Sequence, residues 1–225
     1  MYKRQDYSGL ELRVHAALHD EEMSQAFREG RDLHDETQRR LKLTDRRLAK
    51  NLNFGLTFGA GASNLYDLLR PDLPDLTFQE AASLRARWHD AWKGTSDHIQ
   101  MAYDDKLPRE IVGPRGFFAV IGDMRNTASP MLNYPVQATA AIGAKLALVE
   151  IQRAGLHERL MLANHDEFVL GEFQSKQEAQ EAGDVLVRCM ESGMNEAMEE
   201  MGEIRELNEV PIEVECVVSH AWDKP

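Results

Sequence analysis

The sequence is poor in cysteine, in long apolar runs and in net positive charge. Its 225 residues contain only two cysteines, Cys189 and Cys216, which excludes a disulfide framework and favours a reducing compartment. No apolar run approaches the roughly 18–20 residues of a membrane span, and the first residues lack the charged-then-apolar pattern of a signal peptide. We therefore expect a cytoplasmic protein that does not bind membranes.

Basic residues are outnumbered, because 26 lysines and arginines face 38 aspartates and glutamates and leave a net charge of −12. Such a balance argues against non-specific binding to nucleic acids. The distribution is uneven, however. Residues 39–50 carry six cations and one acid, whereas residues 172–215 carry thirteen acids and three bases. The acidic stretch is typical of a solvated helix face, and the spacing within the basic stretch is considered below.

Apolar periodicity predicts an α+β fold in which helices pack on a small antiparallel sheet. Hydrophobic residues make up 43% of the chain, which is enough to bury a core. Helices are predicted over residues 14–18, 33–41, 45–58, 77–92 and 95–106. Strands are predicted over residues 117–121 and 212–218, with a β-hairpin over residues 160–170.

Capping residues mark the starts of two of the predicted helices. Thr44 is the expected N-cap of the helix over residues 45–58, and Asp45 in its first turn favours the helix dipole. Ser175 and Glu178 have the spacing of a capping box, which predicts a second helix start there.

A further long helix is predicted around Pro135. Proline suits the first turn of a helix, because its missing N–H would have no partner there. The helix is expected to end before Gly155. Its buried stripe would consist of Ile142, Leu146 and Val149, which recur at helical spacing.

The basic stretch continues into a helix face with unusual chemistry. Arg46, Lys50, Phe54 and Phe58 follow one another at intervals of four residues, so one face carries two cations and then two aromatic rings. Two cations one turn apart can hold a polyphosphate, and the next ring can pack on a sugar or base. The alternative is an amphipathic helix with an aromatic core stripe and a solvated basic end, and spacing alone favours this alternative.

Two carboxylates are placed where strands end. Asp6 and Asp166 are 160 residues apart, and together they could hold two divalent cations about 3.5–4 Å apart, the geometry of in-line displacement at phosphorus. Mg²⁺ prefers such oxygen ligands. Taken alone, each of these acids is more simply interpreted as a surface carboxylate. His15 and His19 have a spacing that zinc can use, but no third ligand is evident, which disfavours a metal role.

Several segments resemble the polymerase motifs of the family A DNA polymerases, the bacterial DNA polymerase I group and its phage relatives. Residues 6–13 (DYSGLELR) resemble the first motif, residues 46–59 (RRLAKNLNFGLTFG) the second, and residues 165–167 (HDE) the third. Residues 133–141 (NYPVQATAA) resemble the stretch that precedes the third motif, and residues 210–222 the C-terminal end. All occur in family order, which makes coincidence a poor explanation.

The resemblance implies a division into palm and fingers. The palm, a small antiparallel sheet with helices, would comprise residues 1–34 and 129–225 and contain the hairpin over residues 160–170. The mostly helical fingers would comprise residues 35–128 and contain the motif helix over residues 45–58. Family members carry a thumb, and usually an exonuclease-type domain, before the first motif. We expect both to be absent from this chain, which would then be a truncated fragment.

The resemblance also implies a catalytic centre. Asp6 and Asp166 would bind two Mg²⁺ ions, with the backbone carbonyl of Tyr7 as a further ligand. Glu167 would support the metal site, and Lys50 would act on the triphosphate during catalysis.

Substrate contacts follow from the same resemblance. The residues implied in binding the deoxynucleoside triphosphate are Arg46, Lys50, Phe54, Phe58, His34 and Glu11, the last as a steric gate against a ribose 2′-hydroxyl. Those implied in binding primer–template DNA are Arg13, Asn133, Gln137 and His165. The chain departs from the family in two places. Phe58 stands where a tyrosine is usual, and Ser129 where relatives often carry an arginine, for which Arg125 is an alternative.

The implied function is template-directed DNA synthesis in replication or repair, in a bacterial or phage-infected cell. The primer 3′-hydroxyl would attack the α-phosphate of a deoxynucleoside triphosphate, and pyrophosphate would leave. One alternative is a related single-subunit RNA polymerase, which Glu11 and Phe54 disfavour because such an enzyme must admit a 2′-hydroxyl. Another is a catalytically incompetent fragment, or one subunit of a split polymerase that needs a thumb-bearing partner chain.

Overall fold

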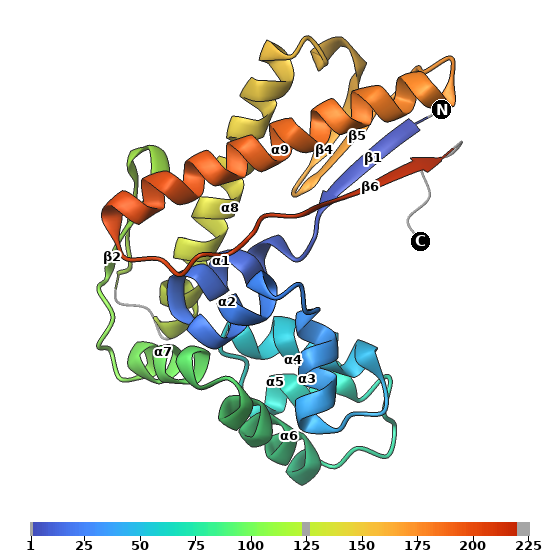
Figure 1. Ribbon diagram of the computed structural model, residues 1–225. Coiled ribbons are helices and arrows are strands. Elements are labelled where there is room, and N and C mark those ends of the chain that lie inside the picture. The colour runs from blue at the N-terminus through green and yellow to red at the C-terminus, as the bar shows by residue number, and fades with distance from the viewer. Residues whose placement is uncertain (1, 123–126, 220–225) are drawn as a thin grey trace.

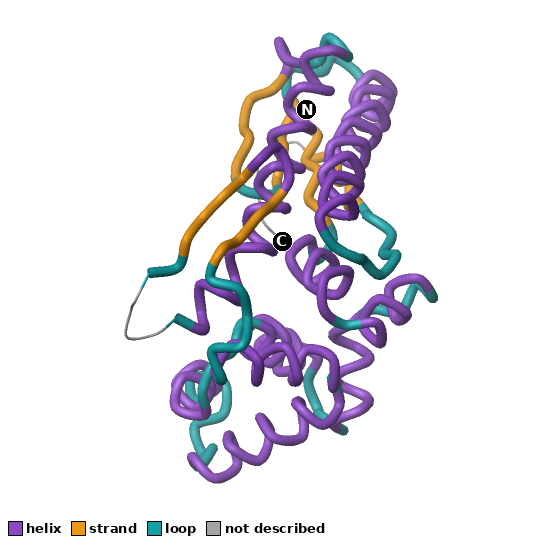
Figure 2. Tube along the Cα trace, turned by 90° about the vertical axis from the view of Figure 1, so that its left-hand side faces the viewer, coloured by secondary structure: helices purple, strands orange, loops and turns teal. Residues whose placement is uncertain are grey.

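The computed structural model describes residues 2–122 and 127–219 and has the predicted α+β fold (Figure 1). All strands lie in the upper part of Figure 2, and the lower part contains only helices and loops. Arg125 and Trp222 fall outside the described residues. The elements in chain order are β1 (Tyr2–Tyr7), α1 (Leu10–His19), α2 (Glu21–Arg28), α3 (Leu33–Leu41), α4 (Arg46–Thr57), α5 (Ala62–Leu69), α6 (Phe78–Ala91), α7 (Lys93–Tyr103), β2 (Glu110–Gly113), η1 (Pro114–Gly116), β3 (Phe117–Val120), α8 (Ala128–Arg153), η2 (His157–Arg159), β4 (Leu160–Asn164), β5 (Glu167–Leu170), α9 (Lys176–Ile204) and β6 (Val214–Ser219).

The main sheet is antiparallel and has the strand order β4-β5-β1-β6. β1 is therefore a central strand, although its sequence is largely polar. Gln5 is fully buried, and its amide donates to the sulfur of Cys216 at 2.9 Å. The strand register places Asp6 opposite Glu167 on β5 and opposite Glu215 on β6. The predicted hairpin is confirmed as β4–β5, and the sheet brings its turn beside the end of β1.

The long helices α8 and α9 pack tightly on each other, and α9 lies across the strands in Figure 1. A β-carbon on Gly193 of α9 would lie only 2.3 Å from the backbone nitrogen of Ala147 on α8. Small residues therefore form the contact face of α8. The predicted stripe is wrong in part, because Val149 is 44% exposed, and Ile142 and Leu146 are only partly buried at the edge of the core.

α8 also begins earlier than predicted, at Ala128, so that Pro135 lies inside the helix and not in its first turn. An internal proline removes one backbone hydrogen bond and costs about 3 kcal/mol in an isolated helix. Met131, Leu132 and Val136 around it are all buried. We attribute the continuation of the helix to this packing, which sequence signals for helix ends do not include.

The caps of two helices test the predictions made from the sequence. The N-cap of α4 is Asp45 and not Thr44, because the Asp45 carboxylate accepts the Arg47 backbone N–H at 2.8 Å. Ser175 caps α9 as predicted and accepts the N–H of Glu178 at 3.1 Å. The prediction at α4 was thus one residue early.

The helical part of the molecule has its own core, centred on the buried rings of Trp88 and Trp92. The predicted helices over residues 33–41 and 77–92 correspond closely to α3 and α6, whereas α2 and α5 were not predicted. Both missed helices have eight residues, too short to give a clear periodic signal. The helix predicted over residues 14–18 belongs to α1, which begins four residues earlier at Leu10.

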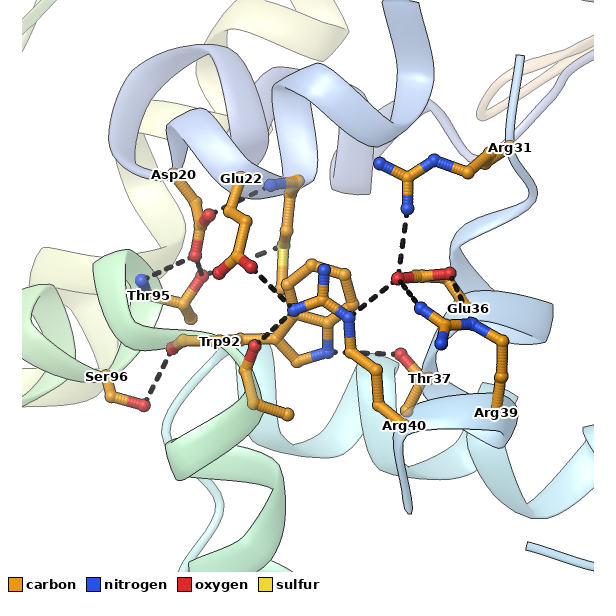
Figure 3. Close-up of polar contacts among 12 residues, drawn as sticks. Asp20, Glu22, Arg31, Glu36, Thr37, Arg39, Arg40, Trp92, Thr95 and Ser96 are labelled. Atoms are coloured by element: carbon orange, nitrogen blue, oxygen red, sulfur yellow. Dashed lines mark hydrogen bonds and ion pairs between the residues drawn. The ribbon is translucent and has the colours of Figure 1, made fainter. Parts of the chain in front are cut away.

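A buried carboxylate on α3 gathers three arginines, one of which reaches neighbouring helices (Figure 3). Glu36 on α3 accepts hydrogen bonds from Arg39 and Arg40 and forms an ion pair with Arg31. The bond from Arg39 is the largest of the effects that lower the pKa of Glu36 to about 2. The guanidinium of Arg40 also lies 4.1 Å from the centre of a Trp92 ring. α3 is therefore firmly fixed to its neighbours.

Three histidines lie close together where α1 meets α7. His15 and His19 come from α1, and His98 from α7 stacks on His19 with ring centres 3.6 Å apart. The ring of Phe58, at the end of α4, packs against the His15 ring in an edge-to-face arrangement. His98 is the third histidine that the sequence did not reveal. Even so, no group of three or more histidine, cysteine, aspartate or glutamate side chains within residues 2–122 and 127–219 could hold a metal ion.

Candidate active site

An open cleft of about 680 Å³ lies where the sheet meets the helical part. It is bounded by the end of β1, the start of α1, the loop before α3, the cationic face of α4, the β4–β5 turn and the start of β6. Most of the residues predicted from the sequence line it: Asp6, Tyr7, Glu11, Arg13, His34, Arg46, Lys50, Phe54, His165, Asp166 and Glu167. Segments far apart in the sequence thus converge on one cavity.

Carboxylates occupy one wall of the cleft. Burial raises the pKa of Asp6, the charge of Asp166 raises it further, and Arg4 opposes both effects. Arg4 contacts Asp6 at 3.3 Å and Glu167 at 3.1 Å. Because burial and the charge of Asp166 both disfavour an unpartnered carboxylate at Asp6, a divalent cation would be a suitable partner there. Mg²⁺ needs few protein ligands because it keeps several waters.

The backbone around Asp6 is fixed by its neighbours. The ring of Tyr7 is buried, and its hydroxyl donates to the carbonyl of Met190 at 2.7 Å. The Tyr7 N–H donates to the carbonyl of Asp166 at 3.3 Å, which ties β1 to the β4–β5 turn. Gly9 has a φ of 62°, and this left-handed conformation turns the chain from β1 into α1. The turn places Glu11 on the cleft wall.

Arg13 is almost fully buried, at 4% exposure. Its guanidinium donates to the carbonyls of Ser8 and Pro211 at 2.7 and 2.6 Å and to the carboxylate of Glu213 at 2.5 Å. Its charge also lies 4.5 Å from the ring of Phe27. These contacts join α1 to the segment before β6, so the predicted contact of Arg13 with DNA would require one of them to be exchanged.

Cations and an aromatic ring occupy another part of the cleft wall. Arg46 and Lys50 are exposed on α4, and Phe54 follows one turn later at 37% exposure. The ring of His34 lies 5.7 Å from that of Phe54, and burial lowers the pKa of His34. His34 is held by Asn53, whose amide lies 3.0 Å from the His34 Nδ1. Arg46, Lys50 and Phe54 therefore share a face of α4 that lines the cleft, as their spacing predicts.

Three predicted residues lie outside the cleft. Phe58 is half-buried beside His15. Asn133 is half-buried on α8, where its amide donates to the hydroxyl of Ser129 at 3.1 Å. Gln137 is exposed one turn further along α8.

Three acids that line the cleft were not predicted as site residues: Asp32, Glu213 and Glu215. Asp32 is the N-cap of α3 and immediately precedes the predicted helix, so a search for capping residues would have found it. Glu215 lies opposite Asp6 only because β6 pairs with β1. A single sequence does not reveal that pairing.

Comparisons with known proteins agree with this geometry. The model of DNA polymerase family A matches residues 2–224. DNA polymerase I of Aquifex aeolicus is 31% identical over 97% of this chain, and the thermostable DNA polymerase I of Thermus aquaticus is 31% identical over 96%. A DNA polymerase of Mycobacterium phage D29 is 31% identical over 73% of the chain. The matched regions span 38%, 26% and 27% of these three relatives.

The fold is also found among solved structures. The polymerase domain of Pol1 from M. smegmatis, solved in complex with DNA primer–template and dNTP, superposes with a TM-score of 0.71. The match covers 98% of this chain and 40% of that one, at 24% sequence identity. Because the family model covers nearly the whole chain, and because the motif residues converge on one cleft, the chain belongs to DNA polymerase family A.

Proposed function

We propose that the cleft carries out template-directed DNA synthesis, in which a primer 3′-hydroxyl attacks the α-phosphate of a deoxynucleoside triphosphate. One observation carries this proposal: a single cavity holds the carboxylates Asp6 and Asp166 together with the cations and ring of α4. Metal-binding acids and phosphate-binding cations in one cavity suit phosphoryl chemistry. The relatives, which are named DNA polymerases, support the same reaction.

Asp6, Asp166 and the backbone carbonyl of Tyr7 would hold two Mg²⁺ ions, with Glu167 in support. Burial and the neighbouring charge of Asp166 raise the pKa of Asp6, and this environment supports the assignment. When bound, magnesium supplies positive charge to the attacking and leaving oxygens. Arg4, already in contact with Asp6 and Glu167, orients these carboxylates from the sheet side.

The nucleotide would lie along α4. Arg46 and Lys50, with His34, would hold the triphosphate, and Lys50 would neutralise charge on the leaving pyrophosphate. The ring of Phe54 would pack on the sugar, with Phe58 offering a stacking surface beyond it. Catalysis of this kind depends on positioning and charge more than on covalent chemistry by the protein.

The template and primer would approach the same cleft. Glu11 would exclude a 2′-hydroxyl, while Arg13, Asn133, Gln137 and His165 would contact the primer–template. We accordingly propose residues 1–34 and 129–225 as palm and residues 35–128 as fingers. The net charge of −12 is compatible with DNA binding, because α9 carries many of the acids and does not line the cleft.

The test measures incorporation of one nucleotide with the protein in excess over primer–template. The excess ensures that weak DNA binding does not limit the signal. Asp6→Asn and Asp166→Asn should each slow incorporation on the order of 100-fold or more, while the melting temperature stays near that of the unchanged chain. Glu203→Gln, at the far end of α9, is the control and should keep the original rate. Equal rates for either aspartate variant and the original chain would refute the assignment.

A further inference from the structure

The two cations of α4 differ in their electrostatic surroundings. Arg46 is held by two carboxylates from the start of α3, with Nη2 at 2.5 Å from Asp32 and Nε at 2.6 Å from Asp35. Lys50, one turn further along, has no ion pair among the described residues. The guanidinium is therefore engaged through two of its nitrogens, while the ammonium is free.

The carboxylates that hold Arg46 are firmly placed. One oxygen of Asp32 caps α3 by accepting the N–H groups of His34 and Asp35, both at 2.8 Å, and the other oxygen contacts Arg46. Burial raises the pKa of Asp32, but these hydrogen bonds outweigh that effect and lower the pKa below its usual value. α3 itself is fixed to its neighbours through Arg40, which pairs with Glu22 on α2 and lies over the ring of Trp92 (Figure 3). Asp32 is thus a fixed partner for the long, rotatable side chain of Arg46.

The charged groups around Arg46 do not favour the binding of an anion. Arg46 with its two carboxylates carries a formal net charge of −1, so Lys50 only brings the group to neutrality. A triphosphate that approached an unchanged cluster would meet two carboxylates and gain little attraction. The guanidinium becomes a good phosphate ligand only when it exchanges at least one carboxylate for a phosphate oxygen.

We infer that Asp35 is a latch on Arg46: it holds the guanidinium before the nucleotide arrives and yields it to the triphosphate, and so sets the affinity for that substrate. This inference rests on the proposed function. Asp35 is the exchangeable member because its side chain is 61% exposed and it contributes one contact. Asp32 is 41% exposed and also caps the helix. Asp35 is a positioning residue, since it acts through Arg46.

The next residue of α4 offers a matched control. Arg47 forms an ion pair with Asp72 at 2.5 Å, in which the arginine is exposed and the aspartate is partly buried. Neither residue lines the cleft. Asp72→Asn therefore removes one carboxylate from one arginine at the start of the same helix, with the same change of charge, but away from the proposed phosphate position.

The experiment measures the dissociation constant of a fluorescent deoxyadenosine triphosphate analogue in Mg²⁺ for the full chain and its variants. Asp35→Asn should bind about two- to fivefold more tightly, the range expected for an exposed ion pair, and Asp72→Asn should bind like the original chain. The gain should shrink at high salt, because exposed charges are screened. It should also be largely lost in an Arg46→Gln background. In nucleotide incorporation, KM should fall for Asp35→Asn while kcat stays unchanged.

Equal or weaker binding by Asp35→Asn would overturn the latch. Failure of the proposed function gives a different result, because Arg46→Gln would then leave the affinity unchanged. Weaker binding by Arg46→Gln without any gain from Asp35→Asn would reject the latch alone. Since Asp35 is exposed, each variant should melt within a few degrees of the original chain, and this is checked first.

Discussion

Glu11 stands in the first turn of α1 and lines the cleft beside the third-motif residues. Burial raises the pKa of this carboxyl, while His165 lowers it and Asp166 raises it. The side chain therefore lies within electrostatic reach of both residues of the β4–β5 turn. This location suits a group that excludes a substrate hydroxyl by bulk and by polarity.

Glu11→Ala should raise the incorporation of ribonucleotides relative to deoxyribonucleotides, by about tenfold or more. The reason is that the variant removes the group proposed to occupy the 2′ position. Single-turnover incorporation of ATP against dATP measures the ratio. Glu215→Ala, which removes another cleft carboxylate, is the control and should keep the original discrimination. An unchanged ratio for Glu11→Ala would place the gate elsewhere.

Phe54→Tyr should make the protein accept dideoxynucleotides several-fold more readily. A phenyl ring offers no hydrogen bond to replace what a missing 3′-hydroxyl contributes, whereas a tyrosine hydroxyl can, and one such bond is worth about 0.5–1.5 kcal/mol. Competition between a dideoxynucleotide and its deoxynucleotide on one template measures the selectivity. Phe78→Tyr changes an exposed ring that does not line the cleft and should have no effect. Equal selectivity in Phe54→Tyr would mean that this ring does not face the sugar.

Much of the cleft was predictable residue by residue. The four-residue spacing of Arg46, Lys50 and Phe54 predicted a shared face, and all three line the cavity. The contacts of Arg46 with Asp32 and Asp35 were not predictable, because they depend on how α3 and α4 are placed in three dimensions. Helical spacing describes one helix at a time.

Helices α8 and α9 approach each other closely at Gly193. Gly193→Ala should destabilise the fold by about 1–3 kcal/mol, the usual cost of overpacking, because the new methyl would overlap the backbone of Ala147. Gly202→Ala is a matched control on the same helix, where the nearest atom is 3.9 Å away, in Leu207. It should be neutral or stabilising, since alanine favours helix. Urea unfolding measures both, and equal stabilities would contradict the close packing.

Elements with strong end signals were predicted best. Thr77 and Glu80 form a complete capping box at the start of α6, where the predicted helix begins. The predicted buried face of α8 is wrong in part, because periodicity assigns the large apolar residues to the contact surface. In this helix pair, small residues make the contact and leave Val149 exposed. Propensity and periodicity do not distinguish these two modes of packing.

Acid should destabilise the whole chain through the three histidines between α1 and α7. Burial lowers the pKa of His15 to about 3 and of His98 to about 4, and it lowers that of His19 well below 6.5. The charged group that faces them is Arg205, which also lowers the pKa of His19 and His98. Below pH 6.5 the unfolded chain therefore binds more protons than the folded one, so the free energy of unfolding decreases as pH falls toward 4.

Melting temperatures measured between pH 8 and pH 4 check this expectation. Each histidine contributes a slope of at most roughly 1.4 kcal/mol per pH unit. His98→Gln cannot take up a proton and should make the pH dependence shallower. A stability that does not change between pH 6.5 and pH 4.5 would show that these histidines are solvated in the folded protein.

The global arrangement was the least predictable level. The class and the β4–β5 hairpin followed from apolar pattern, but the strand order β4-β5-β1-β6 joins segments from both ends of the chain. β1 is polar, and Gln5 is buried in it, so its central place contradicts what hydrophobicity alone would indicate. Only the resemblance of ordered motifs placed Asp6 beside Asp166.

α8 runs through both cores of the molecule. Met131 and Leu132 belong to the core of the helical part, whereas Val136 and Ala140 belong to that of the sheet. Pro135 lies at the border, where the helical ladder lacks one backbone hydrogen bond. A bend of α8 at Pro135 would break no further backbone hydrogen bond, because the proline donates none. Bending therefore costs least at the border between the two cores, and more at positions inside either core.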